Sequence, residues 1–119
     1  MENCDLRFEI AHIGINCADE AEAESVAKLF CKLFGFEMKV GNSSIFAGES
    51  IEVMKTKFLG QNGHIAIRTN DVEKAVEKLK VDGFEVNMDT AKLDATGKIK
   101  SVYLYDEIGG FAIHLLAAK

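Results

Sequence analysis

The sequence predicts an α+β fold in which two βαβββ modules follow one another and form one curved mixed sheet around a cavity. Two observations carry this prediction. A His-Ile-small-Ile pattern occurs twice, at residues 12–15 and 64–67, and the tripeptide Gly-Phe-Glu follows a helical stretch twice, at 35–37 and 83–85. Motifs that return in the same order indicate an internal repeat. We therefore expect one domain, residues 1–119, built from two similar halves.

The first module is expected at about residues 7–56. Residues 7–17 alternate between apolar and polar side chains, as a half-buried strand does. Asp19 is expected to open a helix, and Gly35 to end it in the left-handed conformation. The helix carries an apolar stripe typical of packing on a core: Val26, Leu29, Phe30, Leu33 and Phe34. Three short strands are expected at 36–40, 44–47 and 51–55.

The second module is expected at about residues 62–117. Its first strand is predicted at 64–69, and Asn70 with Glu73 three residues later forms a capping-box pattern for the following helix. Gly83 is expected to end that helix. The apolar stripe consists of Val72, Ala75, Val76 and Leu79. Strands are expected at 84–88, 99–105 and 111–116, with a turn at 106–110.

Candidate metal ligands occur at equivalent places in the two modules. His12 and His64 open the repeated motif, and Glu52 and His114 lie in the last strand of each module. Because side chains alternate across a strand, all four are expected to point away from the helix-covered face and into the cavity. A single strand histidine is more often a core residue, but this set favours a divalent-metal site. The donors suit Zn²⁺, Ni²⁺, Co²⁺, Mn²⁺ or Fe²⁺ without choosing among them.

Four residues are candidates for catalysis or substrate binding. Glu52 is the candidate catalytic base, because a strand carboxylate beside a metal could accept a proton. Ser101 and Tyr103 alternate with apolar neighbours and could line the cavity, although plain packing explains Tyr103 equally well. Arg68 is in phase with His64 and could hold an anionic substrate group, and a surface salt bridge is an equal alternative.

Composition narrows the possible partners. The net charge is −5, and no stripe of Lys and Arg is interleaved with aromatic residues, so nucleic acid is not an expected partner. No apolar run reaches membrane-spanning length, and no signal segment opens the chain. The three cysteines form no close pair, which indicates reduced thiols and a cytoplasmic protein.

Four segments carry a family resemblance: Ala11-His12-Ile13-Gly14-Ile15, Ile51-Glu52-Val53-Met54, Gly63-His64-Ile65-Ala66-Ile67 and Ile108-Gly109-Gly110-Phe111-Ala112-Ile113-His114-Leu115. Over roughly residues 8–117 the chain resembles the vicinal oxygen chelate superfamily, which includes glyoxalases, bleomycin-resistance proteins and extradiol dioxygenases. The resemblance implies a glyoxalase-like fold and a homodimer. It also implies metal ligands on the first and last strands of each module, here His12, Glu52, His64 and His114.

The last segment departs from the family pattern. The family commonly has Asp-Pro-Asp-Gly and then a glutamate, where this chain has residues 107–110 and then His114. Three histidines and one glutamate around a dication leave a formal charge of +1, which favours anionic oxygen ligands such as a 2-oxo carboxylate. Glutathione-dependent glyoxalase and extradiol dioxygenase activities are therefore less expected. The second half also resembles the domain that some bacterial keto-deoxy-phosphogluconate/keto-hydroxyglutarate aldolases carry at their C-terminus.

Three functions follow as hypotheses. The first is a metal-dependent lyase, isomerase or epimerase that acts on a small oxo- or hydroxy-acid through a metal-stabilised enolate. The second is a non-catalytic binding or accessory module that partners a sugar-acid aldolase. The third is a protein that sequesters an antibiotic, which can work without a metal.

Overall fold

The computed structural model describes residues 5–118 and confirms the predicted α+β class, with eight strands and two helices in the described chain. The first half contains β1 (Phe8–Asn16), α1 (Glu20–Phe34), β2 (Met38–Val40), β3 (Ser44–Ala47) and β4 (Ile51–Met54). The second half contains β5 (Gly63–Thr69), α2 (Val72–Val81), β6 (Val86–Leu93), β7 (Ile99–Ile108) and β8 (Phe111–Ala117). Each half therefore has the order βαβββ. Within residues 5–118, neither helix combines the length and the apolarity that crossing a membrane requires.

All eight strands form one sheet in the order β2-β3-β4-β1-β5-β8-β7-β6. The two halves meet where β1 pairs with β5 in antiparallel orientation. On either side of this junction the same parallel pairing repeats, β1 with β4 and β5 with β8. Read outward from the junction, the strands come in the same order in each half. The sheet thus has an approximate twofold symmetry that relates His12 to His64 and Glu52 to His114.

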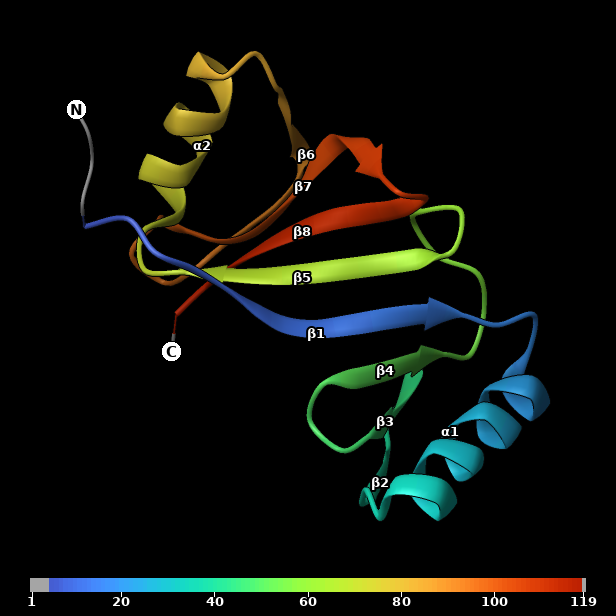
Figure 1. The fold of residues 1–119 in the computed structure, drawn as a ribbon. Coiled ribbons are helices and arrows are strands. Elements are labelled where there is room, and N and C mark those ends of the chain that lie inside the picture. The colour runs from blue at the N-terminus through green and yellow to red at the C-terminus, as the bar shows by residue number, and fades with distance from the viewer. Residues whose placement is uncertain (1–4, 119) are drawn as a thin grey trace.

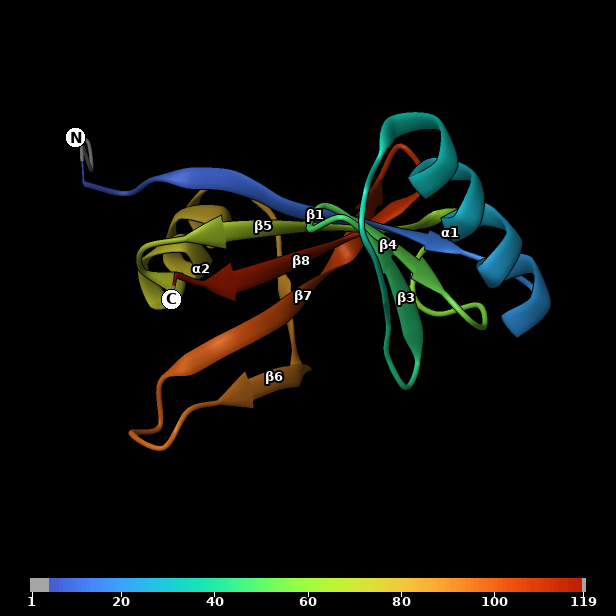
Figure 2. The ribbon, with the colours of Figure 1, turned by 90° about the horizontal axis from the view of Figure 1, so that it is seen from below.

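The two helices cover the same face of the sheet, at its two ends, as Figures 1 and 2 show. Each helix encloses a small core of its own. Beneath α1 the buried residues are Cys17, Ala23, Ala27, Ile45 and Val53. Beneath α2 they are Val72, Ala75, Val76, Val86, Val102 and Leu115. The aliphatic side chains of the strands fill this face, so the opposite, concave face is left for the polar side chains.

The apolar stripe predicted for α1 is only partly buried. Leu29, Leu33 and Phe34 are 56%, 62% and 62% exposed, whereas Ala23 and Ala27 are fully buried against the sheet. The two alanines are four residues apart and therefore lie on one side of the helix. Their small side chains let α1 approach the sheet closely, and the larger stripe is turned to the adjacent side. The stripe of α2 behaves as predicted, with Val72, Ala75 and Val76 buried.

The helix ends confirm three expectations and correct one. Asp19 caps α1 by accepting a hydrogen bond from the backbone N–H of Glu22 at 2.8 Å, and Gly35 ends it with φ 75°. Gly83, with φ 94°, follows α2. The cap of α2 is Asp71 rather than Asn70, because the Asn70 side chain accepts from the Arg7 N–H at 2.8 Å instead. The Glu73 side chain does not complete a capping box either, because it accepts a hydrogen bond from the Ile99 N–H at 2.7 Å.

A β-bulge in β1 sets the direction of His12. Ile10 pairs with Ile67, whereas His12 pairs with Ala66, so two steps along β1 match one step along β5. An extra residue of this kind re-aims the side chains that follow it. Residues paired across a ladder share a face, so Ile10 lies on the helix-covered side with Ile67, and His12 lies on the concave side with Ala66. The bulge at Ala11 therefore brings His12 to the face that His64 occupies.

Candidate metal centre

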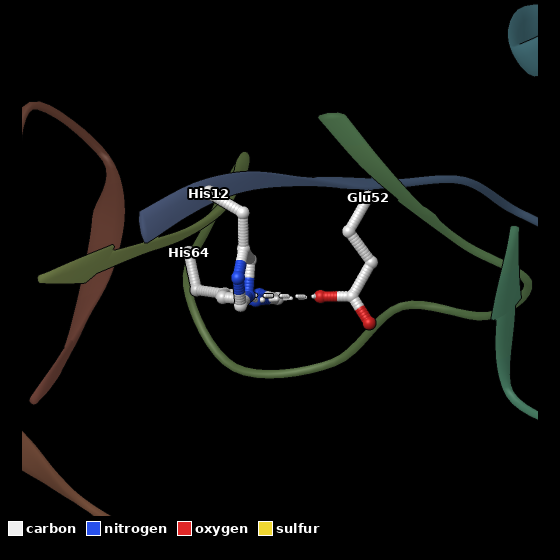
Figure 3. A group of neighbouring side chains, drawn as sticks. All are labelled: His12, Glu52 and His64. Atoms are coloured by element: carbon white, nitrogen blue, oxygen red, sulfur yellow. Dashed lines mark hydrogen bonds and ion pairs between the residues drawn. The ribbon is translucent and has the colours of Figure 1, made fainter. Parts of the chain in front are cut away.

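Three of the four predicted ligands meet on the concave face. The Nε2 atom of His12 lies 3.2 Å from Oε1 of Glu52, and Nε2 of His64 lies 3.1 Å from the same oxygen. The two Nε2 atoms are 3.3 Å apart. Figure 3 shows both rings and the carboxylate converging on one point. Two imidazole nitrogens and one carboxylate oxygen thus form a nearly equilateral triangle.

The sheet register explains why these side chains meet. Gly14 of β1 lies between Glu52 of β4 and His64 of β5 in one row across the sheet. His12 precedes Gly14 by two residues on the same strand and therefore shares its face. The three ligand candidates come from three adjacent strands of a packed sheet, so the backbone that carries them is rigid. A site on such elements holds its geometry better than one on loops.

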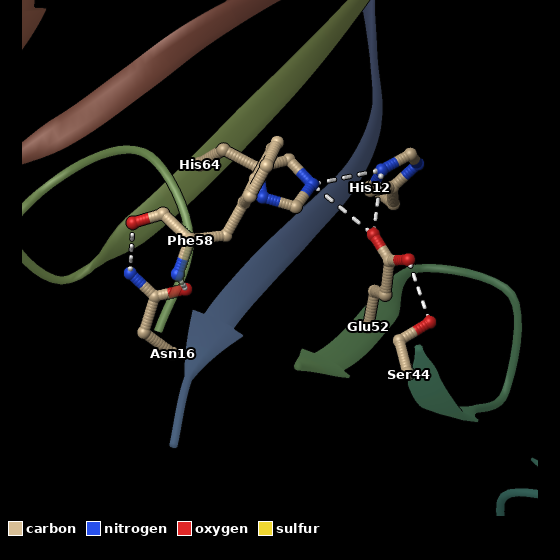
Figure 4. Close-up of polar contacts among 6 residues, drawn as sticks. All are labelled: His12, Asn16, Ser44, Glu52, Phe58 and His64. Atoms are coloured by element: carbon tan, nitrogen blue, oxygen red, sulfur yellow. Dashed lines mark hydrogen bonds and ion pairs between the residues drawn. The ribbon is translucent and has the colours of Figure 1, made fainter. Parts of the chain in front are cut away.

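Glu52 is held by more than the two histidines. Its second oxygen, Oε2, accepts a hydrogen bond from the hydroxyl of Ser44 at 2.7 Å (Figure 4). Burial by itself raises the pKa of the Glu52 carboxyl, but hydrogen bonds from His12, His64 and Ser44 together outweigh burial and lower that pKa well below its ordinary range. The Glu52 carboxyl is therefore ionised near pH 7.

The size of the triangle fits a metal ion. Donor atoms about 2.1 Å from a dication lie roughly 3.0 Å apart in an octahedral site and roughly 3.4 Å apart in a tetrahedral one. The measured edges of 3.1 to 3.3 Å fall between these values. Two histidines and one carboxylate are also a donor set that leaves coordination positions open for a substrate. Hydrogen bonds from two imidazole N–H groups to Oε1 suit the same distances, so a binding experiment has to separate the two states.

The triangle lies in the wall of a cavity of about 330 Å³. The cavity is lined by His12, Ser43, Glu52, Met54, Thr56, Phe58, His64, Tyr103 and His114. Phe58 belongs to the segment that joins the two modules. The side-chain amide of Asn16 holds this segment by donating to the carbonyls of Phe58 and Gly60 at 3.3 and 3.0 Å, and its oxygen accepts from the Phe58 N–H at 3.1 Å (Figure 4).

The same arrangement of strands occurs in solved structures, although no family model and no curated protein matches the sequence. A hypothetical protein from Bacillus halodurans superposes with a TM-score of 0.63 at 18% identity, covering 94% of this chain and 95% of that one. The methylmalonyl-CoA epimerase of Mycobacterium tuberculosis superposes with a TM-score of 0.60 at 15% identity, over 92% and 87% of the two chains. A trihydroxybiphenyl dioxygenase from Sphingomonas wittichii gives 0.54 at 20% identity, over 98% of this chain and 44% of that one.

This chain has the vicinal oxygen chelate fold. At such low identities the likeness establishes the fold and leaves the chemistry to the site itself. The resemblance inferred from the repeated motifs is thus confirmed at the level of architecture. The likeness of the second half to an aldolase-appended domain stays a prediction.

His114, the fourth predicted ligand, lies on the cavity wall of this vicinal oxygen chelate fold but stands apart from the triangle. Its ring stacks on that of Tyr103, with centroids 4.0 Å apart and planes at 1°, and its centroid is 6.2 Å from that of His64. Burial lowers the pKa of His114 to about 4, and the neighbouring His64, His12 and Lys92 act in the same direction. Burial likewise raises the pKa of Tyr103 to about 12, with Glu52 contributing. Both rings are therefore neutral near pH 7, and ligation by His114 stays a prediction.

The three predicted substrate contacts differ in position. Tyr103 lines the cavity of the triangle. Arg68 lines a neighbouring cavity of about 560 Å³ that shares His12 with the first, and its guanidinium lies 3.4 Å from the carboxylate of Glu9. Ser101 is 7% exposed and pairs with Leu116, two residues along the strands from the Tyr103–His114 pair. Tyr103 therefore lies nearest to the candidate ligands.

Sequence reasoning missed three residues around the triangle: Ser44, Asn16 and Gly14. The repeat contained a signal for the first, since Ser44 pairs with Met54 in one half as Ser101 pairs with Leu116 in the other. Asn16 and Gly14 are in phase with His12 along β1, which places them on the same face. Their partners, a connecting loop and a histidine ring, depend on the folded structure and leave no trace in the local sequence.

Proposed function

We propose that this protein is a divalent-metal-dependent lyase, isomerase or epimerase that acts on a small oxo- or hydroxy-acid. The observation that supports it best is the triangle of His12 Nε2, His64 Nε2 and Glu52 Oε1, with edges of 3.1 to 3.3 Å in the wall of a cavity. These three residues would hold the metal, and His114 is the candidate for a fourth position. The open positions would face the cavity.

A bound dication would polarise a substrate carbonyl and acidify the neighbouring carbon. Neutral His12 and His64 with ionised Glu52 leave that centre with a formal charge of +1, which supports an anionic substrate. Glu52 is also our candidate for the proton acceptor. Its lowered pKa keeps it ionised but makes it a weak base, so the carbon proton must be strongly acidified for the transfer to occur.

The cavity supports a small-molecule substrate. Its volume of about 330 Å³ lies at the lower end of the range for ligand pockets. Met54, Phe58 and Tyr103 offer apolar surface, and Tyr103 can also present its hydroxyl. Arg68, in the adjoining cavity, would meet an anionic group that extends past His12. Ser101 stays our candidate for a substrate contact with a smaller effect, because it lies two residues from Tyr103 along β7.

A homodimer is part of this proposal. Exposed apolar side chains on α1, among them Leu29, Leu33 and Phe34, offer a surface that a second copy could cover. Light scattering after gel filtration would give a mass of twice the 13.1 kDa chain. Leu33→Lys should shift the mass toward the monomer, whereas Val81→Lys should not, because Val81 is an exposed apolar residue on α2, away from this surface. A monomer at all concentrations would contradict the dimer and leave the metal proposal standing.

The first experiment is a Co²⁺ titration of metal-free protein, followed by absorption in the visible range. We expect one ion per chain for the wild type and binding weakened by more than about 100-fold for His64→Ala or Glu52→Gln. Glu9→Gln is the matched control. Glu9 is an exposed carboxylate on β1 that pairs with Arg68 and is not part of the triangle. A wild type that takes up no metal would overturn the proposal and favour the antibiotic-sequestering alternative.

The second experiment asks for catalysis. Metal-loaded protein is incubated in D₂O with a panel of 2-oxo acids, and exchange of the carbon-bound proton is followed by NMR. Exchange that is lost in Glu52→Gln would support the enolate chemistry. Metal binding without exchange of any panel member would favour the alternative of a non-catalytic module that partners a sugar-acid aldolase. The cytoplasmic location stays a prediction that neither experiment addresses.

A further inference from the structure

Two equivalent rows cross the middle of the sheet. In the first, His64 of β5 lies opposite Gly14 of β1, and Gly14 lies beside Glu52 of β4. In the second, His12 of β1 lies opposite Ala66 of β5, and Ala66 lies beside His114 of β8. The twofold symmetry of the sheet relates one row to the other. Each row thus has a histidine, a small residue and a last-strand residue, and the small residue is glycine in one and alanine in the other.

In the row that contains Gly14, the His64 ring contacts Glu52 across β1, and an alanine at position 14 would block this contact. The ring of His64 lies directly over Gly14 and reaches Oε1 of Glu52 at 3.1 Å. A Cβ atom on Gly14 would overlap Cε1 and Nδ1 of that ring and lie 2.7 Å from its Nε2. Carbon atoms in contact are ordinarily about 3.5 to 4.0 Å from their neighbours, so the ring would have to leave.

The backbone does not require glycine at this place. Eight glycines of the described chain have a positive φ, and Gly14 is not among them. An alanine could therefore adopt the same backbone conformation without strain. The three heavy atoms nearest to a Cβ at position 14 all belong to the His64 ring.

The alanine row is open. The side chain of Ala66, fully buried, stands between His12 and His114. His12 turns instead toward Glu52 and His64, with its Nε2 at 3.2 and 3.3 Å from their atoms. His114 is left to stack on Tyr103. The three-residue triangle is thus built entirely around the glycine row.

We propose that Gly14 is a positioning residue that lets His64 cross β1 to join Glu52, and that Ala66 at the equivalent place keeps His12 from crossing β5 to His114. This difference of one methyl group explains why the triangle forms on the carboxylate of the first module and why the imidazole of His114 lies outside it. The inference rests on the proposed metal function, but the contact that carries it lies between protein atoms, so its effect on stability can be tested without any metal.

The test is a double-mutant cycle of Gly14→Ala and His64→Ala. In metal-free protein, Gly14→Ala should lower the urea midpoint of unfolding, and in the His64→Ala background the same change should have no effect, since no ring remains to be displaced. A cost of Gly14→Ala that persists without the ring would overturn the proposal. The double variant should fold normally even if Gly14→Ala alone does not.

Metal affinity supplies the second readout, because a merely structural role would not move it. Gly14→Ala should weaken Co²⁺ binding at least tenfold, whereas the inverse change at the equivalent place, Ala66→Gly, should not weaken it. Unchanged binding in folded Gly14→Ala would overturn the proposal. If the wild type binds no Co²⁺, the proposed function fails, and the stability cycle still decides whether Gly14 positions His64.

Discussion

The two halves of this sheet have the same strand order and pairing, but the side chains at equivalent positions make different contacts. In the first half, Glu52 is ionised, bound by Ser44 and joined by two histidines. In the second, the equivalent His114 is neutral near pH 7 and stacks on Tyr103. The strand pairing around the two residues is the same. The duplicated fold therefore has two equivalent positions, and a few side chains give them different surroundings.

The largest effect should separate the histidines of the triangle from His114. His12→Ala or His64→Ala removes a metal-donor atom, and we expect metal affinity to fall by more than about 100-fold. Loss of a residue that only hydrogen-bonds to a ligand typically costs less than this. His114→Ala should lower the affinity less than about fivefold. Isothermal titration with Co²⁺ or Zn²⁺ measures all three. Equal losses at all three positions would mean that His114 moves in to bind the metal.

The next effect concerns the pH dependence of stability in metal-free protein. The folded pKa of His114 is about 4, below its ordinary value of 6.5, so the folded state binds fewer protons than the unfolded state between these limits. Stability is therefore full above pH 6.5 and is lost as the pH falls toward 4. Between pH 7 and 5 we expect a loss of roughly 1 to 2 kcal/mol, after allowance for solvent screening.

Urea unfolding in EDTA at the two pH values measures this loss. His114→Phe keeps a ring against Tyr103 and removes the titrating group, so its stability should fall less between pH 7 and 5 than that of the wild type. The same fall in both proteins would assign the effect to other groups and would show that the two halves do not differ in this respect.

The smallest effect compares the equivalent serines. Ser44 donates to Oε2 of Glu52, and Ser44→Ala should weaken metal binding by roughly 0.5 to 1.5 kcal/mol, the usual net worth of one hydrogen bond. Ser101→Ala, the same change in the other half, should alter the affinity less than about twofold. Both are read from the same titration. A larger loss at Ser101 would indicate that the second half takes part in binding.

The repeat made much of the fold and the site predictable. Matching motifs gave the βαβββ halves, and strand phase brought His12, Glu52 and His64 to one face. The grouping of His12, His64 and Glu52 without His114 was not predictable, because it depends on how the His64 ring lies over Gly14. Local rules also failed where several residues compete for one role.

Two details of the fold show this limit. Leu33 belongs to a regular stripe, yet Ala27 is the residue that packs on the sheet, since a helix can come closer over a small side chain. Asn70 fits a helix cap, yet its side chain is engaged by Arg7 and the neighbouring Asp71 takes the place. In each case a contact with a residue distant in the sequence determines the role of the side chain, and the local sequence pattern does not indicate that contact.

The segment between the modules has a consequence for how such a protein can be divided. Asn16 fastens this connection through Phe58 and Gly60, and Phe58 forms part of the cavity wall. Two separately expressed halves could rebuild the β1–β5 pairing and bring both histidines back together. They would lose part of the support of that wall, because Asn16 of the first half holds Phe58, whereas the backbone N–H of Asn62, four residues later, donates to the carbonyl of Gly110 in the second half at 2.8 Å. Covalent continuity between the two modules therefore helps to fix the wall of the space that a ligand would occupy.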